Sequence, residues 1–219
     1  DSNEQLIEEY HLIDIEKNIL ISQNFDDYYS GIHNISWDSN KKISKLKTID
    51  SSTKNHQESK PLKNIVCDGS YTTSQSIVCA VLSADCLPIL ICNNAGTFAG
   101  VIHVGWRGLE NGIIKKFISK FSQPKNLLCW IGPSISSKHY LVKEDVYRKL
   151  QSLSTDIFVQ VDKQHWSLDL AKAAKIILKT QGVNKIFVDK MCTFENSNLY
   201  YSYRRRSNTG RIASLIWIE

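Results

Sequence analysis

Proline and methionine are scarce in this chain of 219 residues, which contains 4 prolines and 1 methionine, and its net charge is small. The low proline content and a hydrophobic fraction of 42% exclude collagen-like and disordered chains. No stretch reaches the roughly 20 apolar residues that a membrane-spanning helix needs, so we expect no membrane partner. The formal net charge of +5 is too small to indicate a nucleic-acid-binding protein, although it suits an anionic small substrate.

A Cys-x-x-Cys pair is also absent, although the chain contains 6 cysteines. Zinc-ribbon and thioredoxin-like motifs are therefore excluded. Cysteine is too sparse for a disulfide scaffold, and Cys79, Cys92 and Cys129 lie in apolar runs that are typical of buried strands. The acidic, polar start of the sequence does not resemble a secretion signal. We therefore expect a reduced, cytoplasmic protein.

The apolar periodicity predicts an α/β (α+β) fold with mixed β-sheets and flanking helices. Ser76–Leu82 and Leu87–Cys92 have strand patterns, and the second is expected to form a hairpin with 98–104. Apolar residues every four positions predict one amphipathic helix from Leu109 to Phe121. Further strands are expected over 126–131, 156–161, 185–189 and 211–218, and further helices over 144–153 and from an N-cap at Ser167 to Gln181.

Cys86 and His103 are the first candidates for chemistry, because each lies at the end of an apolar strand pattern. The two strands are expected to be neighbours in one hairpin, so these side chains should meet at the same sheet edge. A thiolate and an imidazole suit a zinc or copper site, for which the candidate third ligands upstream are Asp50, His56 and His33. The same pair also suits a cysteine nucleophile with a histidine base. The alternative is that both residues have only a structural role, as a buried cysteine and a core histidine.

Arginine is concentrated at two places that could bind an anion. Arg107 lies at the predicted start of a helix, between Gly105 and Gly108, where the backbone can approach a ligand closely. The segment Tyr200–Arg211 holds three tyrosines and four arginines just before the last predicted strand, which favours a structured loop for stacking and anion binding. A solvated turn and a weak nucleic-acid patch are the alternatives for this segment.

Five segments together resemble one known family in their order and spacing. They are DGSYTT (68–73), SADCLP (83–88), HVGWRG (103–108), IGPSI (131–135) and YSYRRRSNTGR (201–211). The chain is similar to the YfiH-type family, also called the laccase-domain or polyphenol oxidase-like family, whose members are described as purine nucleoside phosphorylases and as peptidoglycan-editing factors. The resemblance implies a single domain over residues 1–219, with residues 1–64 divergent.

The resemblance also implies a metal, usually taken as zinc, that is held by two histidines and one cysteine. Cys86 and His103 match two of these ligands, whereas Asp50 stands where the first histidine is expected. The family's substrate-side arginine segment is not evident within residues 21–31. Copper is a less expected metal, because one cysteine and one or two histidines cannot build the cluster that laccases need.

We therefore expect a zinc-dependent enzyme that acts on purine nucleosides, by phosphorolysis with phosphate or by deamination of adenosine. The expected catalytic residues are Cys86, His103 and Arg107, the expected substrate-binding residues Tyr203, Arg204 and Arg205, and the expected metal ligands Asp50, Cys86 and His103. Tyr203 would stack on the base, and the arginines would hold phosphate. The alternatives are a Cys-His hydrolase acting on an amide, muropeptide editing included, and a non-catalytic binding domain.

Overall fold

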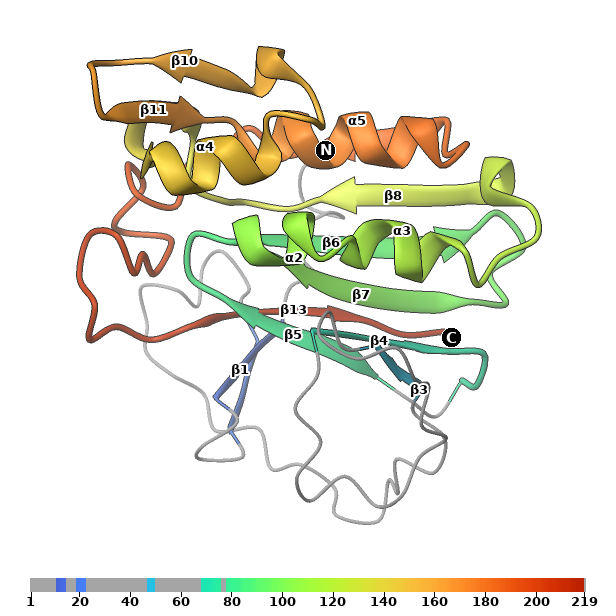
Figure 1. Ribbon diagram of the computed structural model, residues 1–219. Coiled ribbons are helices and arrows are strands. Elements are labelled where there is room, and N and C mark those ends of the chain that lie inside the picture. Colours follow the sequence, from blue (N-terminus) through green and yellow to red (C-terminus); the bar gives the residue numbers. More distant parts are fainter. Residues whose placement is uncertain (1–10, 15–18, 23–46, 50–67, 76–77, 219) are drawn as a thin grey trace.

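A six-stranded mixed sheet lies at the centre of the computed structural model, which describes residues 11–14, 19–22, 47–49, 68–75 and 78–218 (Figure 1). The strand order is β12-β8-β6-β7-β4-β3, and every neighbouring pair is antiparallel except the edge pair β12–β8. The strands are β3 (Lys47–Ile49), β4 (Gly69–Thr72), β6 (Leu87–Asn93), β7 (Ala99–Val104), β8 (Leu127–Ile131) and β12 (Lys185–Val188).

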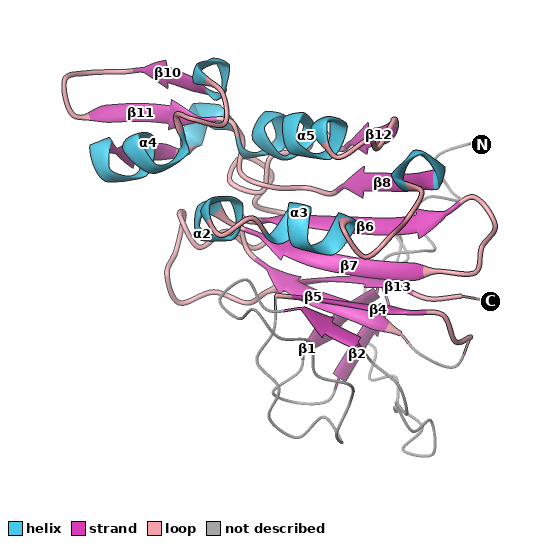
Figure 2. Cartoon of the chain, turned by 45° about the vertical axis from the view of Figure 1, so that its right-hand side comes forward, coloured by secondary structure: helices cyan, strands magenta, loops and turns pink. Residues whose placement is uncertain are grey.

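Two layers cover the faces of this sheet. On one face lie the short helices α2 (Trp106–Glu110) and α3 (Ile113–Ile118), which cross in front of β6 and β7 in Figure 1, together with α5 (Leu170–Thr180). On the other face lies the antiparallel pair β5 (Cys79–Ser83) and β13 (Ile212–Ile216). Figure 2 shows the same layers after a turn of the molecule.

A smaller sheet lies beyond the central one, in the order β10-β11-β9, and α4 (Glu144–Leu150) packs against it. Its strands are β9 (Leu141–Lys143), β10 (Phe158–Gln160) and β11 (His165–Leu168). The hairpin of β1 (His11–Asp14) and β2 (Ile19–Ser22) and the 3₁₀ turns η2 (Pro124–Asn126), η3 (Ser137–His139) and η4 (Thr155–Ile157) complete the described elements.

The core follows from the apolar strand and helix patterns. Alternate residues of β6, namely Leu87, Ile89 and Ile91, are fully buried on the side of the helices, where they meet residues such as Ile113 and Phe117 of α3. Side chains alternate between the faces of a strand, so the opposite face holds a smaller cluster of Cys79, Val81 and Val101 between the two sheets. Burial on both faces fixes β6 and β7 in register, and thereby fixes the sheet edge at which they meet.

The expected mixed α/β fold and the hairpin of β6 and β7 are confirmed, but one predicted helix is wrong. Residues 109–121 form two helices instead of one, because Gly112 adopts a left-handed conformation with φ 72° between α2 and α3. The apolar period continues across this break, since both helices bury their apolar side chains against the same sheet. Periodicity alone could therefore not reveal the break.

The N-cap predicted at Ser167 is also wrong. Ser167 lies in β11, and its hydroxyl donates a 2.7 Å hydrogen bond to the carbonyl of Ser137. Asp169 caps α5 instead, since its carboxylate accepts a 2.8 Å hydrogen bond from the backbone N–H of Lys172. The strands β4, β9 and β11 were not predicted, because three or four residues are too few to show a clear period.

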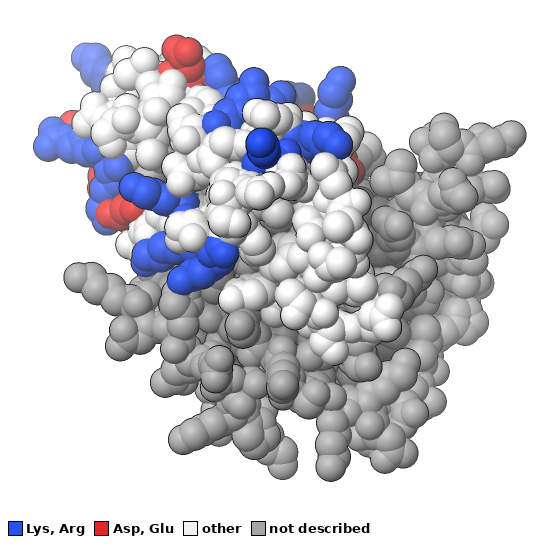
Figure 3. All heavy atoms as spheres, turned by 90° about the vertical axis from the view of Figure 1, so that its right-hand side faces the viewer, with Lys and Arg blue, Asp and Glu red and all other residues white. Residues whose placement is uncertain are grey.

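Of the cysteines expected in buried strands, Cys79 and Cys129 are fully buried, whereas Cys92 is half-buried, and none of the three forms a disulfide among the described residues. In the described part of the chain, no helix has both the length and the apolar character that crossing a membrane requires. On the face shown in Figure 3, Lys and Arg side chains form several separate groups and outnumber Asp and Glu among the described residues.

Candidate functional site

Cys86 and His103 lie at one edge of the central sheet. Leu87 pairs with Val104 and Pro88 pairs with His103 across the β6–β7 ladder, so Cys86 immediately precedes β6 at the end where β7 finishes. The sulfur of Cys86 is close enough to hydrogen-bond the imidazole of His103. The hairpin register therefore brings together the two side chains that the sequence analysis paired.

Asp68 lies on the other side of the His103 ring. Its carboxylate Oδ1 is 3.7 Å from Nδ1 of His103, and its carbonyl accepts a 2.7 Å hydrogen bond from the backbone N–H of His103. Burial lowers the pKa of His103, but the hydrogen bonds and negative charges of Asp68 and Cys86 raise it to about 9 overall. The carboxylate of Asp68 beside Nδ1 thus fixes the orientation of the ring.

Gly105 makes room for the sulfur of Cys86. A Cβ atom at position 105 would lie 2.9 Å from Sγ of Cys86, closer than real Cβ contacts allow. The chain turns from β7 into α2 at this glycine, which is the N-cap residue of the helix. The glycine of the HVGWRG segment thus permits a close approach of the backbone to the Cys86 thiol, and the approach to a ligand that the sequence predicts here stays a prediction.

Tyr140 connects the cysteine to two arginines. Burial raises the pKa of Tyr140 above its ordinary range, the negative charge of Cys86 raises it further, and the positive charges of Arg204 and Arg107 lower it. The guanidinium carbon of Arg204 lies 5.1 Å from the centre of the Tyr140 ring, and its Nη1 donates a 3.0 Å hydrogen bond to the carbonyl of Leu141. Cys86, Arg107 and Arg204, which are far apart in the sequence, are therefore all within electrostatic reach of one buried tyrosine.

Arg107 is exposed and lies against its own neighbour in the chain. Its guanidinium carbon is 4.4 Å from the centre of the Trp106 ring, and the ammonium of Lys149 lies 5.2 Å from the same ring. Stacking on an aromatic face restrains a guanidinium while leaving its N–H groups free to bind an anion. Two cationic side chains, those of Arg107 and Lys149, therefore lie against the Trp106 ring and make this side of the site electropositive.

Asp85 is a site residue that the sequence analysis did not single out. Its side chain is buried, Oδ1 accepts a 2.7 Å hydrogen bond from the Thr193 hydroxyl, and Oδ2 accepts a 2.6 Å hydrogen bond from the backbone N–H of Arg204. Its φ of 88° is a left-handed conformation that non-glycine residues seldom adopt. The acid of the SADCLP segment thus holds the arginine loop in place, while its turn presents Cys86.

Main-chain hydrogen bonds join the other recognised segments around Asp85. The N–H of Ile135 donates to the carbonyl of Asp85 at 2.9 Å, and the N–H of Thr193 donates to the carbonyl of Ser134 at 3.0 Å. The N–H of Gly132 donates to the carbonyl of Pro88 at 2.9 Å. The segments SADCLP, IGPSI and YSYRRRSNTGR therefore form one connected unit at the sheet edge.

Arg205 is hydrogen-bonded to three backbone carbonyls that precede it in the chain. Its Nη1 donates to the carbonyls of Thr193 and Phe194, both at 2.8 Å, and its Nη2 donates to the carbonyl of Tyr200 at 2.6 Å. Tyr203 is 57% exposed, with the guanidinium of Arg211 at 6.0 Å from its ring centre. The loop is structured, as expected; substrate binding by Tyr203, Arg204 and Arg205 stays a prediction.

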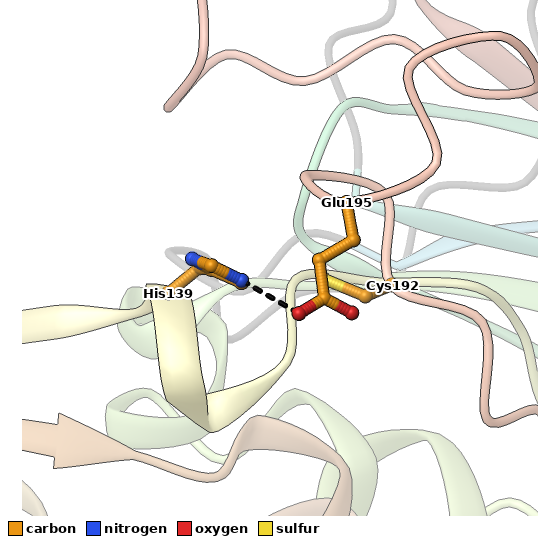
Figure 4. Close-up of side chains that lie close together, drawn as sticks. All are labelled: His139, Cys192 and Glu195. Carbon is orange, nitrogen blue, oxygen red and sulfur yellow. Dashed lines mark hydrogen bonds and ion pairs between the residues drawn. The ribbon is translucent and has the colours of Figure 1, made fainter.

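The expected third metal ligand is not among the residues that the structure describes. Asp50, and the alternatives His56 and His33, lie outside the described residues. A second group of ligand-type side chains does lie within them: one ligand atom each of His139, Cys192 and Glu195, all within 4.8 Å of one another (Figure 4). No sequence pattern assigned a role to Cys192, and the local signal for this cluster is the three-residue spacing of Cys192 and Glu195.

Comparisons with known proteins match this arrangement to one family. The model of the family described as multi-copper polyphenol oxidoreductase laccase matches residues 34–219. The Escherichia coli (strain K12) protein called purine nucleoside phosphorylase YfiH is 37% identical over 155 residues, which are 69% of this chain and 63% of the relative. A Pseudomonas aeruginosa protein called purine nucleoside phosphorylase is 32% identical over 74% of this chain and 69% of its own length.

Solved structures agree with the sequence matches. A Neisseria meningitidis protein has a TM-score of 0.67 and 34% identity, over 70% of this chain and 65% of its own. The protein YlmD of Geobacillus stearothermophilus has a TM-score of 0.66 and 29% identity, over 69% of this chain and 61% of its own. The chain thus spans a little under two thirds of the length of several relatives that it matches.

Proposed function

Because the chain belongs to the family described as multi-copper polyphenol oxidoreductase laccase, and its curated relatives are called purine nucleoside phosphorylases, we propose that it is a metal-dependent purine nucleoside phosphorylase. Two observations support the proposal: Cys86 and His103 meet at one sheet edge, and Arg107 and Arg204 are within electrostatic reach of the same buried tyrosine, Tyr140, as Cys86. This arrangement combines a soft ligand pair with two guanidinium groups, which suit phosphate.

Zinc suits the donor set of this edge. A thiolate and an imidazole are common zinc ligands, and a carboxylate on the far nitrogen of a ligating histidine, where Asp68 lies, fixes the orientation of the ring. Gly105 leaves the sulfur of Cys86 room at the edge. We propose Cys86, His103 and Asp50 as the ligands. When bound, zinc supplies positive charge that polarises an oxygen of the substrate.

The arginines would position the phosphate. In phosphorolysis, a phosphate oxygen attacks C1′ of the ribose and the bond from C1′ to the purine nitrogen breaks. The purine leaves with the bonding electron pair and takes up one proton, which yields free base and ribose 1-phosphate. Arg107 and Arg204 would hold phosphate by charge-assisted hydrogen bonds, and the exposed ring of Tyr203 would stack on the base.

A nucleoside panel tests this function. Purified protein is incubated with adenosine, inosine or methylthioadenosine, with and without phosphate, and free base, ribose 1-phosphate and ammonia are measured. Phosphate-dependent release of base is expected, whereas ammonia release from adenosine identifies deamination. Elemental analysis is expected to find zinc, and Cys86→Ala and His103→Ala should lose turnover together with the zinc bound at this sheet edge. No turnover, or turnover that is unchanged in both variants, would contradict the proposal. His165→Ala, in β11, is the matched control.

A second function is favoured by the alignment of Cys86, His103 and Asp68. A nucleophile, a base and a carboxylate that orients the base are the parts of a cysteine hydrolase, and amides, muropeptides included, are the candidate substrates. In that case Cys86 is alkylated stoichiometrically by iodoacetamide and amide cleavage persists in a chelator. Loss of turnover on chelation, with recovery on adding zinc, favours the phosphorylase instead.

A further inference from the structure

His139, Cys192 and Glu195 form a cluster that the proposed reaction does not use. His139 ends the 3₁₀ turn η3, and Cys192 and Glu195 lie in the segment that follows β12. Nε2 of His139 is 2.8 Å from Oε1 of Glu195, and one ligand atom of each residue lies within 4.8 Å of the others. Figure 4 shows the three side chains directed toward one another.

Two of the three side chains, those of His139 and Cys192, are held in place by contacts with residues outside the cluster. The His139 ring stacks on Phe194, with ring centres 4.4 Å apart and an interplanar angle of 21°. The sulfur of Cys192 is buried and accepts a 3.3 Å hydrogen bond from the backbone N–H of Ser136. This hydrogen bond ties the Cys192 sulfur to Ser136, the N-cap residue of the η3 turn that carries His139.

We propose that this cluster is a second metal site, which binds a zinc-type divalent cation through His139, Cys192 and Glu195. Imidazole, thiolate and carboxylate are the ligand types that zinc prefers, and a water molecule completes a tetrahedral shell. Glu195 is 43% exposed, so the ion can enter from solvent and the fourth position can hold water. The ion replaces the proton of the Cys192 thiol, which is released to solvent.

The position of the site gives it a structural role. The neighbouring Thr193 donates to Asp85, and the carbonyls of Thr193 and Phe194 accept hydrogen bonds from Arg205. A metal between His139 and Cys192 would therefore join η3 to the segment that anchors the arginine loop. The proposal does not depend on the reaction that the protein catalyses.

Lys138 allows a test in which the metal affinity is expected to increase rather than decrease. Its ammonium lies 2.9 Å from Oε1 of Glu195, on the same oxygen that His139 contacts, and its side chain is 75% exposed. This cation competes with a metal ion for the carboxylate. Replacing Lys138 with glutamine should therefore strengthen metal binding, whereas removing a ligand should weaken it.

Cobalt titration of the full chain tests the site, because a thiolate bound to Co²⁺ gives a charge-transfer absorption band. All variants carry Cys86→Ser, so that Cys86 cannot contribute. A band is expected in this background. The affinity for Co²⁺ should be at least about tenfold weaker in His139→Ala and in Glu195→Gln, because even residues that only hydrogen-bond to a metal ligand contribute that much. The affinity should rise in Lys138→Gln and stay unchanged in His165→Ala. Zn²⁺ should abolish the band by displacing cobalt.

Several results would overturn the proposal. They are the absence of a band in the Cys86→Ser protein, a band that persists when Cys192→Ser is added, and equal affinities in the His139→Ala, Lys138→Gln and His165→Ala variants. His139 and Glu195 are partly exposed, so their variants test the site even if the buried Cys192→Ser variant does not fold. A zinc-induced rise in melting temperature that is smaller in His139→Ala provides a second readout.

Discussion

The backbone N–H of Arg204 donates a 2.6 Å hydrogen bond to the carboxylate of Asp85, a residue 119 positions earlier in the chain. The other oxygen of this carboxylate accepts the hydroxyl of Thr193 at 2.7 Å. One buried acid thus joins the turn that presents Cys86 to the loop that presents Arg204. The two halves of the candidate site are therefore expected to respond together to changes at Asp85.

Asp85→Asn should loosen the arginine loop. Asparagine can keep both partners, by accepting from the N–H of Arg204 and donating to the Thr193 hydroxyl, but it loses the negative charge. The hydrogen bond from Arg204 is then no longer charge-assisted, which is expected to cost about 1 kcal/mol of unfolding free energy. Denaturant unfolding measures this loss, and the KM for phosphate should rise. Asp189→Asn is the control, because Asp189 accepts a local 2.8 Å hydrogen bond from the N–H of Met191. An equal effect of both substitutions would contradict the role given to Asp85.

Gly105→Ala should displace the thiol of Cys86, because the added Cβ would lie 2.9 Å from Sγ. Zinc affinity, measured by competition with a chelator, is expected to fall by roughly tenfold or more, as for other changes that reorient a metal ligand. Gly112→Ala provides the comparison. Its φ of 72° makes alanine cost about 1 kcal/mol of stability, but no atom lies within 4 Å of the new Cβ. Equal zinc affinities in the two variants would rule out the packing argument.

Arg205→Lys should destabilise the protein more than a neighbouring substitution does. A lysine ammonium cannot reproduce the planar fork that reaches the carbonyls of Thr193, Phe194 and Tyr200. The unfolding free energy is expected to fall by about 1–3 kcal/mol, since each orphaned group loses a hydrogen bond. Arg206→Lys, at an exposed position, should change it by less than about 0.5 kcal/mol. Thermal and denaturant unfolding of both variants decide the matter.

The buried thiol of Cys129 should make stability fall at alkaline pH. Burial raises the pKa of Cys129 from its usual 9.0 to about 12. Between these values the thiol of the unfolded chain loses its proton while that of the folded chain keeps it, so the stabilisation present below pH 9 is lost as the pH rises toward 12. The alkaline fall in unfolding free energy is expected to be shallower in Cys129→Ala. Parallel pH curves for the two proteins would contradict this.

The hairpin of β6 and β7 could be predicted because its information is local. Two long apolar runs flank a turn, and their pairing follows from chain connectivity, so the meeting of Cys86 and His103 could be inferred as well. The split between α2 and α3 could not be inferred, because both helices face the same core and the apolar period passes through Gly112. The cap at Asp169 was missed because β11, which contains Ser167, is too short to show a period.

The sequence alone determined the family, the mixed α/β class and the candidate site residues, because motifs and apolar periodicity are local features of the sequence. The tertiary structure alone decided which of these residues act on one another. Asp85 contacts Arg204, Tyr140 is within electrostatic reach of Cys86 and both arginines, and His139 meets Glu195. These pairs lie far apart in sequence and meet because burial of the sheet faces fixes the strand ends, and with them the loops that the strand ends carry.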